Sequence, residues 1–297
     1  MADDQKFISE LQSSNAEVRF AAWRAAGEVT PGVISDVGKL AASTTPGIAK
    51  AAREALTTMT HAVGKDPSAP KRPGVVKGLI ELTGASYALD VRAHALRLLS
   101  GIAGDDAIPA IAKLMASPEL REEAVYCLER IPTAAATAAI VDSYAGAKDE
   151  FKPRILAALG HRRAAEGLPL CVEAMKSPSA ELALAGLKAY GRIGKKPTVA
   201  ARIPDVKALT PWQATEHADS LLRYADLQAK AGNAVEAMRL YKTALDRSEE
   251  HYQCAAVIGL AKLGTADAAA AILLKLKSGN TRVRITAQQA WLSMARA

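Results

Sequence analysis

The feature that most constrains this chain is a pattern of about 30 residues that recurs along its 297 residues. Eight copies occur, and their starting positions are 30, 43, 29, 31, 31, 70 and 31 residues apart. The starting positions, counted as offset zero, are Val18, Ile48, Val91, Leu120, Phe151, Leu182, Tyr252 and Val283. A unit of this length cannot bury a core alone, so we expect the copies to stack on one another.

Every copy carries the stripe of an α-helix, because offsets 0, 4, 7 and 8 lie on one helical face. Offset four is small in all copies but one: Ala22, Ala52, Ala95, Ala124, Ile155, Gly186, Ala256 and Ala287. Small residues there let a neighbouring helix approach closely. Another apolar-periodic segment and a short polar break, such as 13–15, 116–118 or 176–178, precede each of the first six helices.

The composition agrees with a helical chain, since 49% of residues are hydrophobic but only 4% are aromatic, the excess being alanine and leucine. We therefore predict an all-α fold, an α-solenoid of stacked antiparallel helix pairs with about eight repeats.

The repeat resembles the HEAT-like repeats of the phycobilisome-lyase type, in which a hydrophobic residue followed by arginine opens the second helix. Four copies carry that pair: Val18-Arg19, Val91-Arg92, Leu120-Arg121 and Val283-Arg284. The other four have Ala49, Lys152, Ala183 and Gln253 in place of the arginine. The resemblance covers roughly residues 3 to 194 and two repeats after residue 248, and it implies a fold without implying a function.

The pattern changes after residue 196. We predict an N-terminal solenoid of six repeats (1–196), a proline-containing linker (197–211) and C-terminal repeats (249–297). Residues 212–248 resemble a single tetratricopeptide hairpin, because Gly232, Ala237, Tyr241 and Ala244 have the spacing of that family. The terminal proline of that family is absent, and we expect this hairpin to join two helical stretches.

No motif for catalysis, metal binding or cofactor binding stands out. HEAT-type di-iron hydroxylases hold metal on His-Glu pairs, but glutamate follows none of the histidines here, which are His61, His94, His161, His217 and His251. No two of them lie three or four residues apart. The glycines at 191 and 194 lack the spacing of a phosphate-binding loop. We expect no catalytic residue, no metal and no cofactor, and we interpret the chain as a protein that is not an enzyme.

The cysteines Cys127, Cys171 and Cys254 are odd in number, far apart and set in helical patterns, so we expect core residues in a reducing compartment. The longest apolar run has seven residues, too few for a membrane span. No secretory signal is recognisable after Met1, which predicts a cytoplasmic protein, or an exported one if a signal peptide has been removed.

A row of basic residues is the best functional lead. Offset ten in copies four to seven is Arg130, His161, Arg192 and Lys262, and offset six adds Tyr126 and Lys188. Arg162 and Arg163 extend this row. Stacking would align these side chains as a surface for an acidic protein, although bases are also common at helix C-termini because of the helix dipole. A second lead is the pair Phe20 and Trp23, which either forms a docking end or packs on the N-terminal helix.

These observations favour a non-catalytic scaffold, or a subunit of a larger assembly, that binds a protein partner through the curved face of its helices. Two alternatives stay open. A chromophore lyase or isomerase of the phycobilisome-lyase type shares the repeat, and a nucleic-acid-binding HEAT protein fits the net charge of +7, although nucleic acid is not the favoured partner. The sequence does not indicate an oligomeric state.

Overall fold

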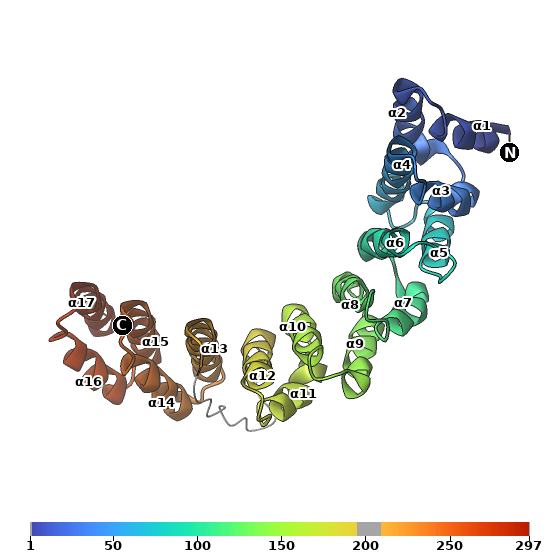
Figure 1. Cartoon of the computed structure of the whole chain (residues 1–297). Coiled ribbons are helices and arrows are strands. Elements are labelled where there is room, and N and C mark those ends of the chain that lie inside the picture. The colour runs from blue at the N-terminus through green and yellow to red at the C-terminus, as the bar shows by residue number, and fades with distance from the viewer. Residues whose placement is uncertain (1, 195–208, 297) are drawn as a thin grey trace. The chain divides into compact units, whose positions relative to one another are not determined.

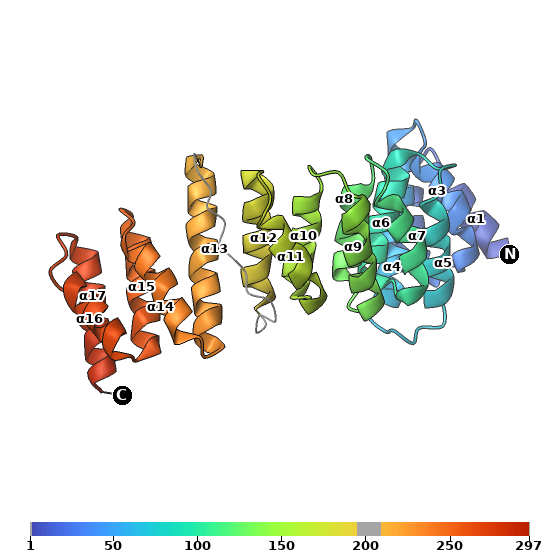
Figure 2. The ribbon, with the colours of Figure 1, turned by 90° about the horizontal axis from the view of Figure 1, so that it is seen from below.

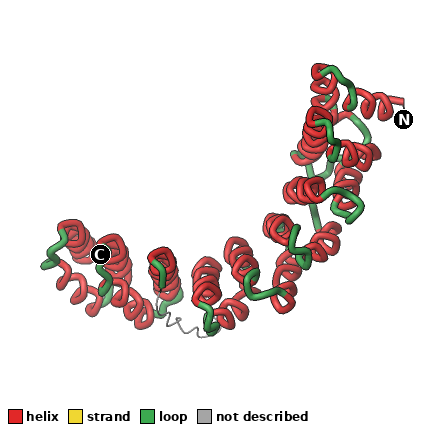
Figure 3. Tube along the Cα trace, in the orientation of Figure 1, coloured by secondary structure: helices red, strands yellow, loops and turns green. Residues whose placement is uncertain are grey.

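A computed structural model describes residues 2–194 and 209–296. These residues form seventeen α-helices and four short 3-10 turns joined by loops, and they contain no strand (Figure 3). The chain divides into two compact units, residues 1–147 and 148–297. Most of the predicted linker, 197–208, lies outside the described residues, whereas Thr210 and Pro211 form the start of a helix.

Unit 1 is a stack of antiparallel helix pairs in two layers (Figure 1). The layer of first helices holds α1 (Ala2–Leu11), α3 (Ile34–Ala41), α5 (Arg72–Leu82), α7 (Ile108–Leu114) and α9 (Ala134–Gly146). The layer of second helices holds α2 (Ala16–Arg24), α4 (Pro46–Gly64), α6 (Leu89–Ile102) and α8 (Arg121–Arg130). Each second helix packs on the first helix of its own pair, and α2, α4 and α6 each pack on the next second helix of the unit.

Unit 2 repeats this arrangement. Its first layer holds α11 (Leu168–Ala174), α14 (Ala234–Leu245) and α16 (Ala266–Lys275). Its second layer holds α10 (Lys152–Arg162), α12 (Ala180–Ile193), α13 (Pro211–Lys230), α15 (Glu250–Leu263) and α17 (Thr281–Ala295). The predicted fold class is confirmed: the described chain is an all-α, HEAT-like stack of helix pairs.

The small residues at offset four lie where helices touch. All eight of these positions are buried. Gly186 shows why size matters, because a Cβ added there would lie 2.8 Å from the carbonyl oxygen of Cys171 and 3.0 Å from the backbone nitrogen of Met175. The backbones of α11 and α12 therefore meet directly at this position. Offset zero is buried in the last six copies, whereas Val18 is 36% exposed at the first.

The arginine that follows offset zero has a structural role. Arg19 donates to the carbonyl oxygens of Ser13 (2.6 Å) and Ser14 (3.0 Å), which follow α1. Arg92 donates to the carbonyl of Thr83 after α5 at 3.0 Å, and Arg284 donates to that of Ser278 after α16 at 2.8 Å. Each guanidinium thus satisfies carbonyls left unpaired where the first helix of its pair ends.

Of the three predicted polar breaks, 13–15 contains a residue whose side chain caps a helix, and 176–178 directly precedes such a residue. Asn15 accepts from the backbone N–H of Glu17 at 2.8 Å, and Ser179 accepts from that of Leu182 at 3.4 Å. The break at 116–118 differs, because the residue that caps α8 is Leu120, which has no capping side chain. There the carbonyl of Ser117 accepts from the backbone N–H groups of Leu120 and Arg121 instead.

Helix α13 is a second-layer helix that was not among the eight copies counted in the sequence. It packs on α12 on one side and contacts α15 on the other. His217 lies midway in sequence between Leu182 and Tyr252, so the 70-residue gap contains one further second helix. The predicted hairpin is therefore made of the second helix α13 and of α14, the first helix of the pair that α15 completes.

The three cysteines are free and buried, and burial raises the pKa of Cys127 and Cys171 to about 12. These thiols are core groups, as predicted. None of the described helices combines the length and apolar character needed to cross a membrane.

The first prediction concerns the contact at offset four. Gly186→Ala should lower the free energy of unfolding by about 1 to 3 kcal/mol, because the new methyl group overpacks a backbone contact. Gly101→Ala is the matched control, since nothing lies within 4 Å of a Cβ there. It should raise stability by up to about 1 kcal/mol through helix propensity. Denaturant unfolding measures both, and equal losses would contradict the proposed packing.

The second prediction concerns pH. Burial lowers the pKa of His94 and of His217, with the charge of Arg247 a second cause for His217. In the unfolded chain both imidazoles have the ordinary pKa of 6.5. Below pH 6.5 the unfolded state therefore binds more protons, so stability is lost as the pH falls. The loss between pH 7 and pH 5 should be smaller in the His94→Gln, His217→Gln double variant, and an unchanged loss would exclude these residues as its source.

Candidate protein-interaction site

The candidate site lies on the second layer of unit 2, where α10, α12 and α13 are side by side (Figure 2). Two glycines let these helices approach. A Cβ on Gly160 would lie 3.1 Å from the Cα of Ala189, and one on Gly191 would lie 3.4 Å from the Cβ of Arg223. Between α12 and α13 the rings of Tyr190 and Tyr224 meet edge to face, with centroids 5.2 Å apart.

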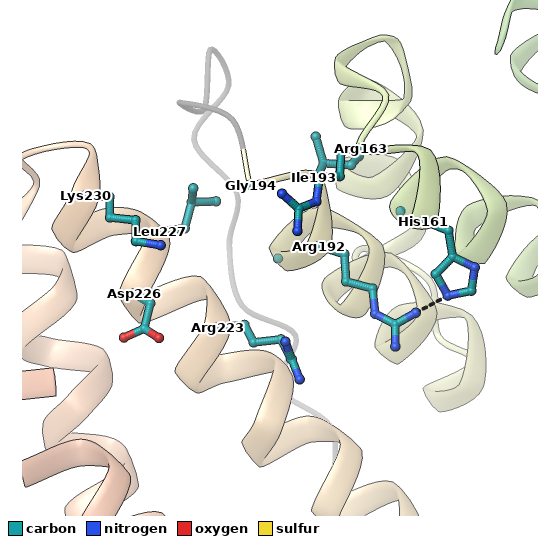
Figure 4. A pocket seen from close by; sticks show the side chains of 11 residues that line it. His161, Arg163, Arg192, Ile193, Gly194, Arg223, Asp226, Leu227 and Lys230 are labelled. Carbon is teal, nitrogen blue, oxygen red and sulfur yellow. Dashed lines mark hydrogen bonds between the residues drawn. The ribbon is translucent and has the colours of Figure 1, made fainter. Parts of the chain in front are cut away.

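A cleft of about 460 Å³ lies at the C-terminal ends of these helices (Figure 4). Side chains of α10 and α12 stand on one side, and those of α13 stand on the other. We call it the basic cleft. Its lining residues are Gly160, His161, Arg163, Gly191, Arg192, Ile193, Gly194, Arg223, Asp226, Leu227 and Lys230.

The charged groups of the basic cleft are paired unequally. Arg223 Nε donates to Asp219 Oδ2 at 2.8 Å. Arg192 Nη1 contacts His161 Nε2, and because a guanidinium can only donate, the imidazole nitrogen is the acceptor. Arg163 and Lys230 form no ion pair with any described residue.

Asp226 is the one carboxylate among the lining residues of this cleft. Its Oδ1 accepts a hydrogen bond from the hydroxyl of Tyr241 at 2.6 Å. Tyr241 is buried, and burial together with the Asp226 charge raises the pKa of its phenol above the ordinary range. Tyr241 therefore stays a donor and fixes the position of Asp226.

A second cleft of about 480 Å³ adjoins the first, since His161 and Arg192 line both. We call it the apolar groove. Its other lining residues are Pro153, Ala157, Glu181, Leu184, Ala185, Lys188, Ala189, Trp212, Gln213 and Glu216. Lys188 and Glu216 form an ion pair across it, between α12 and α13.

Trp212 stands in this groove with 68% of its surface exposed. A capping box places it at the first turn of α13: Gln213 N donates to Thr210 Oγ1 at 3.3 Å, and Thr210 N donates to Gln213 Oε1 at 3.0 Å. The ring is thus held on a regular helix end instead of on a loose loop.

The structure brings together four of the sequence-predicted site residues in unit 2. His161, Arg163, Lys188 and Arg192 line the two clefts, whereas Arg162 is half-buried and lines neither. Lys262 is exposed on α15, and α13 separates it from Arg192 in the layer. The predicted row is interrupted at this point, because the repeat count on which it was based did not include α13 as a second helix.

Sequence reasoning missed Trp212, Arg223 and Lys230, all on α13. The 70-residue gap is the signal for α13 itself, and it could have found Arg223, which holds offset six when His217 is taken as offset zero. Lys188 holds the same offset on α12.

The remaining predicted residues belong to unit 1. Tyr126 is 42% exposed, and the guanidinium of Arg130 lies 5.5 Å from its ring centroid. Phe20 is 50% exposed and meets Trp23 edge to face at 5.1 Å, with Arg24 at 5.6 Å from the Phe20 ring. Each group is an aromatic and arginine cluster on one second helix, with Tyr126 and Phe20 exposed and Trp23 half-buried.

The described residues contain no group of three or more His, Cys, Asp or Glu side chains that could hold a metal ion. What the two clefts offer chemically is recognition: guanidinium and ammonium donors in one, and an apolar floor with an exposed indole in the other.

No family model and no curated protein matches this chain. Among solved structures it is similar to Kap121p, at 13% identity over 99% of this chain and 37% of that chain, with a TM-score of 0.57. It is also similar to Kap95p, whose binding induces the switch loops of RanGDP to adopt the GTP-bound conformation; that match has 14% identity, covers 98% of this chain and 43% of that chain, and has a TM-score of 0.53.

The chain spans less than half the length of either karyopherin. Human deoxyhypusine hydroxylase in complex with glycerol matches at 16% identity over 76% of this chain and 98% of that chain, but its TM-score of 0.40 indicates nothing about this chain's activity. The karyopherin matches support the HEAT-like helical repeat fold, and any inference about function comes from the geometry of the site.

The third prediction concerns the hydrogen bond under the basic cleft. Tyr241→Phe should cost about 1 to 2 kcal/mol of stability, because it removes a donor to a carboxylate. Tyr126→Phe is the control: that hydroxyl makes no hydrogen bond to any described residue and should be lost at almost no cost. Thermal unfolding compares the two, and an equal effect would mean that the Asp226 contact contributes nothing.

Proposed function

We propose that this chain is a non-catalytic scaffold, or a subunit of a larger assembly, that binds a protein partner through its second-layer helices. The observation that carries the proposal is the pair of adjoining clefts on α10, α12 and α13, one basic and one largely apolar. Stacked helical repeats commonly use such extended faces for binding. The protein Kap95p, which has this fold, acts on RanGDP by binding it, and this supports the same general mode here.

The proposal extends to the partner and the location. Arg163 and Lys230 form no ion pair with described residues, which favours an acidic partner. Free, buried cysteines suit a reducing compartment such as the cytoplasm. The resemblance to phycobilisome-lyase repeats and to a tetratricopeptide hairpin stays a prediction, and so does the lyase alternative, which tetrapyrrole binding by the purified chain would test.

The fourth prediction tests the scaffold proposal. Affinity purification of the full chain from its native organism should recover at least one partner in stoichiometric amount. The double charge reversal Arg130→Glu, Arg192→Glu should weaken that recovery, because it inverts charge on second-layer helices. Arg130 is exposed, and exposed charge changes alter stability by less than about 0.5 kcal/mol, whereas Arg192 is half-buried and its contact with His161 is lost.

Its control is the double variant Lys77→Glu, Lys113→Glu, which makes the same charge change at exposed positions of the first-layer helices α5 and α7. This variant should keep the partner. Purification of the chain without any partner, or equal loss in both double variants, would contradict binding through the second layer.

A further inference from the structure

Arg163 is the residue of the basic cleft that the fold explains least. It ends α10 with φ 52° and ψ 40°, the left-handed conformation, and no other described non-glycine residue has a positive φ. Helices α12 and α15 end in the same way, but with Gly194 and Gly264, both at φ 65°. A residue with a Cβ is less favourable than glycine in this conformation.

The helix dipole does not account for Arg163 either. The last turn of α10 already contains His161 and Arg162, and Arg162 supplies the positive charge that a helix C-terminus favours. Arg163 is exposed, its side chain lines the basic cleft, and it has no ion pair among the described residues. A strained residue whose side chain faces a cleft is a sign of a ligand site.

The basic cleft fits a carboxylate. Arg163 at the end of α10 and Lys230 at the end of α13 come from two helices and line one cleft. A guanidinium can hold a carboxylate through two parallel hydrogen bonds, and an ammonium adds a point charge. The lining carboxylate, Asp226, accepts from Tyr241 and forms no ion pair with Arg163 or Lys230.

The apolar groove fits a large apolar side chain. The indole of Trp212 is mostly exposed beside Pro153 and Leu184, and tryptophan is enriched where binding energy concentrates. Glu181 also lines this groove, and its carboxylate opposes a nucleic acid, whose phosphates would follow both clefts, more than a protein segment that places an apolar side chain here and its carboxylate in the basic cleft. This arrangement favours a protein segment over a nucleic acid.

The chain itself does not offer a complementary occupant in residues 195–208. That stretch contains Lys195, Lys196, Arg202 and Lys207 but only one acidic residue, Asp205. Its charge has the same sign as that of the basic cleft, so the complement comes from another molecule.

We propose that the basic cleft and the apolar groove together form a bipartite site for one acidic protein segment, an inference that rests on the proposed function. A carboxylate of the segment pairs with Arg163 and Lys230, and a neighbouring leucine or aromatic side chain packs against Trp212. Because the clefts share His161 and Arg192, both features lie close together in the bound segment.

The test selects twelve-residue peptides from a random phage-displayed library on the full-length chain and measures the selected peptides by fluorescence anisotropy. We expect sequences in which Asp or Glu adjoins Leu, Phe or Trp. Arg163→Gly and Trp212→Ala should each weaken their binding about tenfold. Lys242→Ala, which removes an exposed cation from the last turn of the first-layer helix α14 outside both clefts, should leave binding unchanged.

The Arg163→Gly variant has a second readout, because it should raise the melting temperature while it weakens binding. If the Arg163→Gly variant has the wild-type melting temperature and the wild-type peptide affinity, the role proposed for Arg163 is overturned. Selection of no peptides, or of peptides without acidic residues, or equal binding to all variants would overturn the bipartite site. Binding of a 20-nucleotide DNA that Arg163→Gly abolishes would overturn it in favour of nucleic acid.

Failure of this inference is distinguishable from failure of the scaffold proposal. A natural partner that co-purifies equally with wild type, Arg163→Gly and Trp212→Ala would overturn the bipartite site and leave the scaffold intact. A chain that co-purifies with no partner at all would remove the scaffold proposal itself.

Discussion

Close approach of helix backbones is the constraint on which this fold depends. An alanine or glycine at offset four, buried in seven of eight repeats with Ile155 buried in the other, keeps each second helix against its neighbours. At Gly186 the approach is so tight that backbone atoms of α11 would meet any Cβ. Packing of this kind gains its energy from many small contacts, which explains how a chain with 4% aromatic residues builds a core.

The hydrophobic-arginine pair completes this arrangement with hydrogen bonds. Close packing of helices leaves the last carbonyls of each first helix near the start of its partner, and these carbonyls have no acceptor role within their own helix. Arg19, Arg92 and Arg284 satisfy such carbonyls from the second helix. The hydrophobic-arginine pair that resembles HEAT-like repeats thus caps the end of the preceding helix. Repeats without this arginine can satisfy those carbonyls with another residue, as where Arg53 donates to the carbonyl of Ala41.

The sequence was sufficient for the fold because the helical stripe is a local signal repeated many times. It was less informative about the site. His161 and Arg192 are 31 residues apart, one repeat, so stacking predicts their contact. Trp212, Arg223 and Lys230 depend on the place of α13 in the second layer, and the hairpin pattern around Gly232 obscured that place. The two aromatic and arginine clusters of unit 1 needed only i, i+3 and i, i+4 spacing to be found.

Basic residues near helix ends raise the question of which charges serve the fold and which serve a partner. The helix dipole favours a cation at Arg192, Lys230 and Lys262 whether or not a partner binds there, because each lies in a last turn. It does not account for Arg223, which stands inside α13, nor for Arg163, which occupies a backbone conformation that favours glycine. A residue that served only to balance the dipole of α10 would not need to occupy the left-handed conformation. The basic cleft therefore differs from the other helix ends through Arg163, and the function proposed for it depends on that side chain more than on the net charge of the chain.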